Sequence, residues 1–280
     1  AARALERIYA SSGRNHDLSR ILRVQVKLED EADARRALLG RLGALAEEAL
    51  RDDAAAITAW KERLEDDPAD AEALAALDRL YERIGDRRQL VEILRIRERN
   101  AEDADQRKVF MWRAAQTLES LGDVDEAILA YRAVLDDFGA DRKVLGALAG
   151  LYERGERWHD LAETLEADLG LATETSDRIE LLTRLGDVRR IRLQEIPEAI
   201  EAYRQALTID PSTSSAREAL EELLGNEGAR VEAAEILRPL YEADGADDKL
   251  LRVLDIQIDQ ESGLDARLEL LGRAASVAEK

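Results

Sequence analysis

The stretch EAIEAYRQALTIDP, residues 198–211, decides the fold. Ala199, Tyr203 and Ala206 are spaced four and three residues apart, which places their side chains on one face of a helix. The small alanines let a neighbouring helix approach closely, and the tyrosine fills the gap beyond Ala199. Pro211 then ends the helix, because proline has no backbone N–H and disfavours a helical conformation in the residue before it. The stretch therefore predicts a helix that packs tightly against another along one face.

Relatives of this stretch occur elsewhere in the chain. AAAITAWKERLEDDP at 54–68 and EAILAYRAVLDDFG at 126–139 follow the same pattern, and LERIY at 5–9 returns as LDRLY at 77–81 and LAGLY at 148–152. The repeating unit is about 72 residues long. A repeat of this length indicates supersecondary units stacked in a row instead of one globular core.

Each period contains two helical hairpins. A tyrosine, a glycine and a leucine at intervals of four and five residues occur at Tyr9, Gly13 and Leu18, at Tyr81, Gly85 and Leu90, and at Tyr241, Gly245 and Leu250. A tyrosine late in one helix, a glycine that takes a left-handed C-cap and a leucine early in the next helix form a helix-turn-helix hairpin. At Tyr152, Gly155 and Leu161 the glycine comes one residue early.

The turns predict about sixteen helices, at residues 1–11, 15–29, 32–50, 53–66, 70–84, 87–100, 104–120, 124–137, 141–154, 157–169, 175–192, 196–209, 213–224, 229–244, 247–260 and 264–279. We expect one all-α array over residues 1–280, with periods at 1–70, 71–141 and 142–213 and an irregular final period at 214–280.

The final period contains one helix more than the pattern requires. Residues 161–188 align with 250–277 at an offset of 89, so the helix predicted at 213–224 is an insertion. One added helix exchanges the layers of all helices that follow it. We therefore expect irregular stacking between residues 211 and 246, with helix 229–244 in the outer layer and bent at Pro239.

Composition excludes several classes of function. Lys plus Arg number 41 against 61 Asp plus Glu, and a formal charge of −20 repels nucleic acid and anionic lipid. No apolar run has the length of a membrane-spanning helix, so direct membrane insertion is not expected. The chain has no cysteine, which fits a reducing cytoplasm and also a periplasmic or cell-envelope protein. We expect a cytoplasmic protein, and the second compartment stays open.

The repeats resemble the tetratricopeptide repeat family. Seven residues follow that family's order, namely Leu182, Leu185, Gly186, Ala199, Tyr203, Ala206 and Pro211, with one residue inserted between Gly186 and Ala199. The same insertion separates Gly43 from Ala56, whereas the copy with Ala115 and Ala127 needs none. The resemblance implies a right-handed α-solenoid of antiparallel helix pairs, which binds peptides or partner domains on its concave face and performs no chemistry.

Residues that carry chemistry are scarce. His16 and His159 occupy the same place in two periods, which is typical of exposed first-turn residues and not of a metal site. Asp137, Phe138 and Gly139 form a kinase-like triplet, but the other kinase motifs are missing, so a helix end with its glycine stop explains them better. Acidic groups such as 65–67 lack the spacing of a calcium loop. We predict no catalytic residue, no metal and no cofactor.

Trp112 is the one aromatic residue that the core pattern does not require. Phe110, Met111 and Trp112 are consecutive, and a helix cannot bury three neighbours on one stripe, so with Met111 and Ala115 inward Trp112 turns toward the groove. The alternative is that Trp112 packs against an adjacent repeat. The candidate partner-binding residues are Trp112, Arg79, Arg83, Gln116, Arg154 and Arg190. For the arginines the alternative is neutralisation by neighbouring Glu82, Glu119 and Glu153.

The sequence thus predicts a non-enzymatic scaffold that binds a protein or peptide partner, acidic or amphipathic, in its concave groove. The alternative is an architectural spacer or assembly segment of a larger bacterial envelope or motility complex. Because arginines outnumber lysines 35 to 6, we expect a bacterial source of high GC content. The chain starts without Met, and we expect it to be part of a longer chain or complex.

Overall fold

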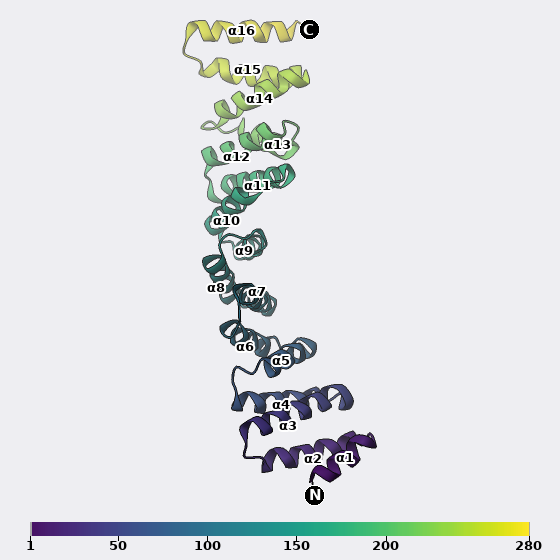
Figure 1. The fold of residues 1–280 in the computed structure, drawn as a ribbon. Coiled ribbons are helices and arrows are strands. Elements are labelled where there is room, and N and C mark those ends of the chain that lie inside the picture. The colour runs from purple at the N-terminus through teal and green to yellow at the C-terminus, as the bar shows by residue number, and fades with distance from the viewer. Residues whose placement is uncertain (1, 280) are drawn as a thin grey trace. The chain divides into compact units, whose positions relative to one another are not determined.

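A computed structural model describes residues 2–279, and these residues form α-helices joined by short turns (Figure 1). The helices are α1 (Ala2–Ser11), α2 (Asn15–Leu28), α3 (Ala32–Leu45), α4 (Asp53–Asp66), α5 (Ala71–Ile84), α6 (Arg87–Arg99), α7 (Ala104–Leu121), α8 (Val124–Phe138), α9 (Arg142–Arg154), α10 (Trp158–Leu171), α11 (Thr175–Asp187), α12 (Ile196–Ile209), α13 (Ser214–Leu223), α14 (Arg230–Asp244), α15 (Asp247–Gln260) and α16 (Leu264–Ala278). The predicted all-α fold and its sixteen helices are confirmed over the described residues.

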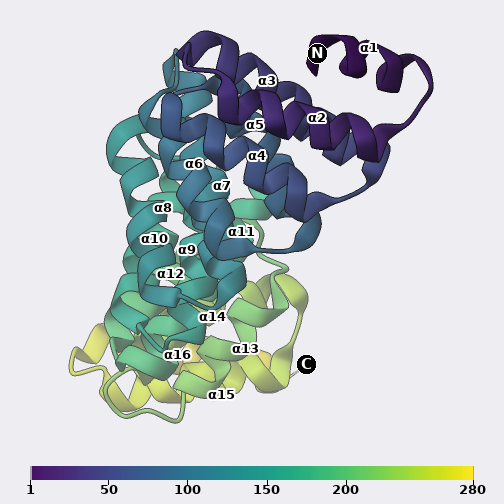
Figure 2. The same ribbon diagram turned by 90° about the horizontal axis from the view of Figure 1, so that it is seen from below.

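The chain forms two compact units, Ala1–Gly139 and Ala140–Lys280. Within each unit every helix packs against its neighbours in the chain, as in an α-solenoid. In unit 1, α5 and α7 form one layer and α6 and α8 the other; in unit 2, α9 and α11 form one layer and α10 and α12 the other (Figure 1 and Figure 2). The helices that come first in each hairpin therefore share a face within each unit.

The core of each unit runs from helix to helix. In unit 1, Trp60 of α4 packs with Leu77 and Tyr81 of α5 and with Leu94 of α6, and all four side chains are buried. In unit 2 a single cluster takes one or more residues from every helix of α11–α15, among them Leu182, Tyr203, Leu220, Leu237 and Leu254. Because each helix buries apolar surface on its two neighbours, the stacking of hairpins stabilises them together.

The glycine and the aromatic residue of the repeat pattern contact each other. A Cβ atom built on Gly186 would lie 2.5 Å from Cε1 of Tyr203, and one built on Gly43 would lie 2.5 Å from Cε2 of Trp60. Both aromatic side chains are almost fully buried. The absence of a side chain on the glycine is what lets the ring lie against the facing helix.

The inserted residues form π-helical turns. α3 continues into a π turn at Ala46–Leu50, and α11 continues into another at Val188–Leu193, so the helices predicted at 32–50 and 175–192 are α-helical only up to Leu45 and Asp187. A π turn accommodates one extra residue within a helix. These are the two copies in which one residue is inserted after the glycine, and the copy without the insertion, α7–α8, has no π turn.

Each π turn ends at a residue in the left-handed region, where L-residues other than glycine are strained. Arg51 has φ 56° and Gln194 has φ 60°. The Gln194 side chain donates hydrogen bonds to the backbone oxygens of Arg190 and Ile191, both at 3.2 Å, which compensates part of the strain. For the exposed Arg51 side chain the structure shows no such bond within the described residues.

We expect Arg51→Gly to stabilise the protein by about 0.5–1 kcal/mol, because glycine adopts positive φ without steric cost. Gln194→Gly relieves the same strain but loses two hydrogen bonds, so its gain should be smaller. Urea unfolding of both variants beside the parent chain measures the difference. A loss of stability in Arg51→Gly would contradict the strain.

The hairpin turns follow the sequence pattern closely. Gly13, Gly85 and Gly245 have positive φ, as predicted. In the deviating copy the left-handed residue is Glu156, at φ 53°, whereas Gly155 has φ −88°. Glu156 comes four residues after Tyr152, so the interval from tyrosine to left-handed residue is kept although the glycine is displaced.

The helix predicted at 213–224 is present as α13. It packs against α11 and α12, and α14 then packs against α12 and α13 before pairing with α15. α14 contacts α12, and the exchange of layers stays a prediction. α14 is a continuous α-helix through Pro239, and the bend there stays a prediction.

No helix of the described chain combines the length and the apolar composition that crossing a bilayer requires.

Candidate partner-binding face

The face of α7 that carries Trp112 is partly exposed. Val109, Trp112 and Gln116 follow one another at spacings of three and four residues, so they lie on one side of the helix. Val109 is 52% exposed, Gln116 is exposed and Trp112 is partly buried. Met111 and Ala115 are buried, as predicted. α7 therefore has an apolar stripe in the core and a second, shorter one at the surface.

Trp112 packs within its own hairpin. Its ring centroid lies 5.3 Å from that of Tyr131 in α8, with an angle of 59° between the ring planes. Tyr131 itself is 1% exposed, and its hydroxyl donates a hydrogen bond of 2.9 Å to Glu119. Trp112 thus contacts the other helix of its own hairpin. The alternative to partner binding given by the sequence was that Trp112 packs against an adjacent repeat. The contact holds one part of Trp112 and leaves the rest accessible.

Arg79 and Arg83 lie one turn apart on the exposed side of α5 and converge on acids of the preceding hairpin. Both reach Glu47, at 3.5 Å and 3.1 Å, and Arg83 also pairs with Asp53 at 2.6 Å. The hydrogen bond to Asp53 raises the pKa of the Arg83 guanidinium. The arginines are neutralised in part, as the alternative held, but by Glu47 and Asp53 and not by Glu82.

Each of the three glutamates named from sequence makes a contact that the sequence pattern did not predict. Glu82 pairs with Arg113 at 3.2 Å, Glu119 accepts the bond from Tyr131, and Glu153 pairs with Arg184 at 2.6 Å. These contacts join helices one hairpin apart or lie within one hairpin. Proximity in sequence was therefore a poor guide to the ion pairs.

A buried carboxylate fixes α5, α6 and α7 to one another beneath this face. Asp78 of α5 is 3% exposed and accepts two hydrogen bonds from Arg113 of α7, at 2.8 Å and 2.7 Å, and one from Arg97 of α6. The bonds to Asp78 raise the pKa of Arg113 against the opposing effect of burial. The Arg97 guanidinium also lies over the Phe110 ring, 4.3 Å from its centroid. A charge in the interior needs such partners.

Sequence reasoning missed this cluster, although a signal was present. Asp78 follows Leu74 by four residues and precedes Tyr81 by three, so it interrupts the apolar stripe of its helix. A carboxylate at a core position implies buried cationic partners. Its partners are 19 and 35 residues away in the chain and could not be chosen from the pattern alone.

The two remaining candidates belong to unit 2. Arg190 lies in the second π turn, pairs with Glu222 at 2.5 Å and donates to the Tyr203 hydroxyl at 3.3 Å. That hydroxyl donates to Asp187 at 2.7 Å, and burial, followed by this bond, raises the tyrosine pKa. Arg154 is exposed at the end of α9. Arg190 is held by its own unit, with a side chain only 19% exposed, and this favours a structural role.

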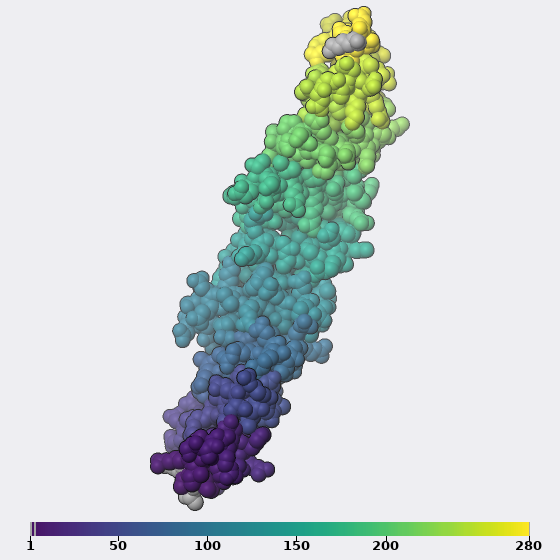
Figure 3. Space-filling view, turned by 90° about the vertical axis from the view of Figure 1, so that its right-hand side faces the viewer, coloured from purple at the N-terminus to yellow at the C-terminus, as the bar shows by residue number. Residues whose placement is uncertain are grey.

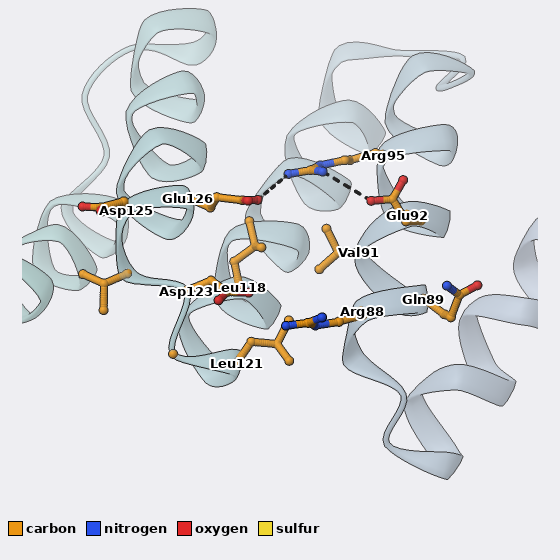
Figure 4. A pocket seen from close by; sticks show the side chains of 12 residues that line it. Arg88, Gln89, Val91, Glu92, Arg95, Leu118, Leu121, Asp123, Asp125 and Glu126 are labelled. Atoms are coloured by element: carbon orange, nitrogen blue, oxygen red, sulfur yellow. Dashed lines mark hydrogen bonds and ion pairs between the residues drawn. The ribbon is translucent and has the colours of Figure 1, made fainter.

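A separate cleft of about 700 Å³ lies on α6 and the turn between α7 and α8 (Figure 4). Arg95 crosses it, pairing with Glu92 at 3.4 Å and with Glu126 at 3.2 Å. Its lining is rich in charge, with Arg88, Asp123 and Asp125 in addition to these three. Small-molecule pockets are mostly apolar, so the cleft does not resemble one. None of the residues predicted from sequence lines it.

His16 and His159 are both exposed, in agreement with their assignment to first turns. Among residues 2–279 no group of three or more His, Asp or Glu side chains is arranged to hold a metal ion.

Comparison with known proteins identifies the repeats. Residues 110–136, 144–179 and 179–213 match the tetratricopeptide repeat. These segments cover most of the hairpins α7–α8, α9–α10 and α11–α12, which include a first hairpin of the period as well as second ones. No curated protein matches the chain.

Several solved structures are similar to parts of this chain. YrrB, described as a TPR protein with an unusual peptide-binding site, is 13% identical over 66% of this chain and 91% of its own, with a TM-score of 0.38. MamA is 16% identical over 63% of this chain and 92% of its own, with a TM-score of 0.40. MamA from Desulfovibrio magneticus RS-1 is 18% identical over 66% and 98%, with a TM-score of 0.37. On the family matches, residues 110–136, 144–179 and 179–213 are tetratricopeptide repeats, and over these segments the chain is similar to that family.

Proposed function

We propose that the chain is a non-enzymatic scaffold that binds a partner segment on the layer formed by α5 and α7 of unit 1. Tetratricopeptide repeat proteins typically mediate protein–protein interactions and are generally not enzymes. The observation that carries the proposal is the second apolar stripe of α7, where the exposed Val109 lies beside Trp112 on a helix whose core stripe is already satisfied. Tryptophan and arginine are both enriched among the residues that form binding hot spots.

The partner segment should be amphipathic. An apolar side chain on Val109 and Trp112 removes their surface from water, which is favourable in proportion to the area covered. An acidic side chain of the partner competes with Glu47 and Asp53 for Arg79 and Arg83, whose side chains are 63% and 45% exposed. The exchange of one carboxylate for another costs little, so charge supplies selectivity and the apolar contact supplies most of the affinity.

We expect Trp112→Ala to weaken binding of the native partner about thirtyfold, since truncation of an aromatic anchor typically costs at least ~2 kcal/mol. The partner is first recovered with the chain from the source cell and identified, and its affinity is then measured by calorimetry. Because Trp112 also packs on Tyr131, a second variant is needed. Val109→Glu changes a side chain that is 52% exposed, so it should reduce affinity and leave the melting temperature unchanged.

Leu129→Ala provides the matched control, because Leu129 is an exposed apolar residue of α8 outside the proposed face. The Leu129→Ala variant should bind the partner with the same affinity as the parent chain. If Val109→Glu binds the partner as tightly as the control does, the proposed face is wrong. If no specific partner is recovered, the chain is better described as an architectural segment of a larger assembly.

A further inference from the structure

α14, α15 and α16 of unit 2 follow the sequence pattern of α5, α6 and α7 of unit 1. Residues 231–276 align with 71–116 at a constant offset of 160. The same buried residues occupy the core positions of both segments, namely Leu77 and Leu237, Tyr81 and Tyr241, and Leu94 and Leu254. Figure 3 shows the surface of α14–α16 in yellow-green and yellow. The two segments can therefore be compared position by position.

The comparison shows that one buried cluster has exchanged its groups. Arg238 occupies the position of Asp78, and Gln257 occupies the position of Arg97. In unit 1, Arg97 of α6 donates to Asp78 of α5. In unit 2 the donor comes from the other helix, because Arg238 of α14 donates to Oε1 of Gln257 in α15, at 3.1 Å. Unit 2 therefore has a cation and a neutral amide where unit 1 has a carboxylate and a cation.

This exchange leaves hydrogen-bond donors without acceptors. An arginine can only donate, so the oxygen of the Gln257 amide must face Arg238, and its Nε2 group is left to bond elsewhere. Gln257 is 7% exposed, and within the described residues its Nε2 makes no hydrogen bond. Arg238 makes no ion pair there. Because a buried donor without a partner costs free energy, an acceptor is missing at this place.

A cavity of about 390 Å³ opens beside these two side chains. In addition to Arg238 and Gln257, its lining includes the apolar Val231 and Leu270 and the acids Glu235 and Glu261. Glu235 is exposed and Glu261 is partly exposed, whereas Gln257 is buried. The cavity thus presents donors in its interior and carboxylate acceptors nearer to the solvent.

The cavity is complete within α14, α15 and α16. In unit 1 the same place is filled by Asp78 of α5 with Arg97 of α6 and Arg113 of α7, and α8 supplies none of these groups. A helix that packs on α16 as α8 packs on α7 therefore leaves the cavity open.

We propose that this cavity binds the side-chain amide of an asparagine or glutamine in a partner segment. The amide oxygen accepts from Nε2 of Gln257 and from the guanidinium of Arg238, and the amide N–H groups donate to the two acids of the lining. A carboxylate would meet the two acids, and an ammonium group would meet Arg238, so a neutral group that both accepts and donates is selected. The site lies in unit 2 and does not depend on the face formed by α5 and α7.

Nuclear magnetic resonance of the ¹⁵N-labelled chain tests the proposal. The probes are the N-acetyl, N-methylamide derivatives of glutamine, glutamate and lysine, titrated at about 0.15 M salt so that the overall charge of the chain is screened. We expect the glutamine probe to shift the side-chain N–H signals of Gln257 in a saturable way. It should bind at least tenfold more tightly than the glutamate and lysine probes.

Variants of the lining locate the binding. Gln257→Leu and Arg238→Met each remove one partner of the amide, and both should lose binding of the glutamine probe, followed by the backbone N–H signals of Val231 and Leu270. The double variant Arg238→Asp, Gln257→Arg restores the groups of unit 1 and should also lose it. Arg252→Met is the control, because Arg252 is an exposed arginine of α15 outside the lining, and it should bind like the parent chain.

Circular dichroism verifies that each variant keeps its helices. A glutamine probe that causes no saturable shift overturns the proposal. So does binding that survives in both Gln257→Leu and Arg238→Met, or a glutamate probe that binds as tightly as the glutamine probe, which would make the cavity a carboxylate site.

Discussion

Replacing Asp78 by alanine is expected to lower the free energy of unfolding by about 2–4 kcal/mol. The change removes the carboxylate that Arg97 and Arg113 share and leaves these two cations without it. Asp78 itself is 3% exposed. The loss falls toward the lower side of the range for a broken buried pair, because the arginine side chains are themselves 24% and 29% exposed and can turn partly to water. Guanidinium unfolding followed by circular dichroism measures it.

Asp105→Ala is the matched control for this variant. Asp105 is an exposed acid in the first turn of α7 without an ion pair in the described structure, so its loss should change stability by less than about 0.5 kcal/mol. Equal effects of the two substitutions would show that the buried pair contributes nothing specific. Asp78→Ala should also weaken partner binding, because Arg113 is the tie that holds α7 beside α5.

Gly186→Ala is expected to destabilise unit 2 by about 1–3 kcal/mol, because overpacking a filled interior costs this much. The new methyl group would lie 2.5 Å from the ring of Tyr203, a side chain that is 0% exposed and cannot move aside freely. Gly146→Ala provides a control with the opposite sign. Gly146 lies within α9 with open space around its missing Cβ, so alanine there should stabilise by about 0.5–1 kcal/mol.

A double variant separates the clash from other effects of the substitution. Tyr203→Leu removes the ring that the new methyl group meets, so Gly186→Ala should cost much less in that background. Thermal unfolding of the four proteins of the cycle gives the coupling energy. Additive losses in the double variant would place the cost of Gly186→Ala elsewhere than at the ring.

The helices were predictable because the chain marks their ends repeatedly and locally. Asp70, Asp86 and Asp103 each accept a hydrogen bond from a backbone N–H in the first turn, and glycines or prolines follow the helix ends. Such signals depend on residues within a few positions of each other. The same signals recur in successive repeats, so each prediction is supported several times. In the sequence, the π turns appeared only as one extra residue in the spacing. The spacing does not determine how the structure takes up that residue.

The candidate site was predictable only in part, because it depends on contacts between hairpins. Trp112 was found as a residue in excess of the core pattern, but its contact with Tyr131 and the exposure of Val109 depend on side-chain placement. The ion pairs join residues that are farther apart in the sequence. Arg83 and Asp53 are 30 residues apart and Arg113 and Glu82 are 31 apart, which is somewhat less than one hairpin of the 72-residue period. A search for opposite charges at that separation would have found them.

The π turns have a consequence for how such a chain changes length over evolution. In the two hairpins that carry them, the glycine still meets its aromatic partner although the linker is one residue longer. The extra residue widens one helical turn before the chain reverses. In the helix that follows, the residues of the repeat pattern have their usual spacing. A single-codon insertion at this point thus alters a local pitch and spares the stacking of every later hairpin. The helical turn before the chain reverses therefore absorbs a change in length, and the later repeats keep their spacing.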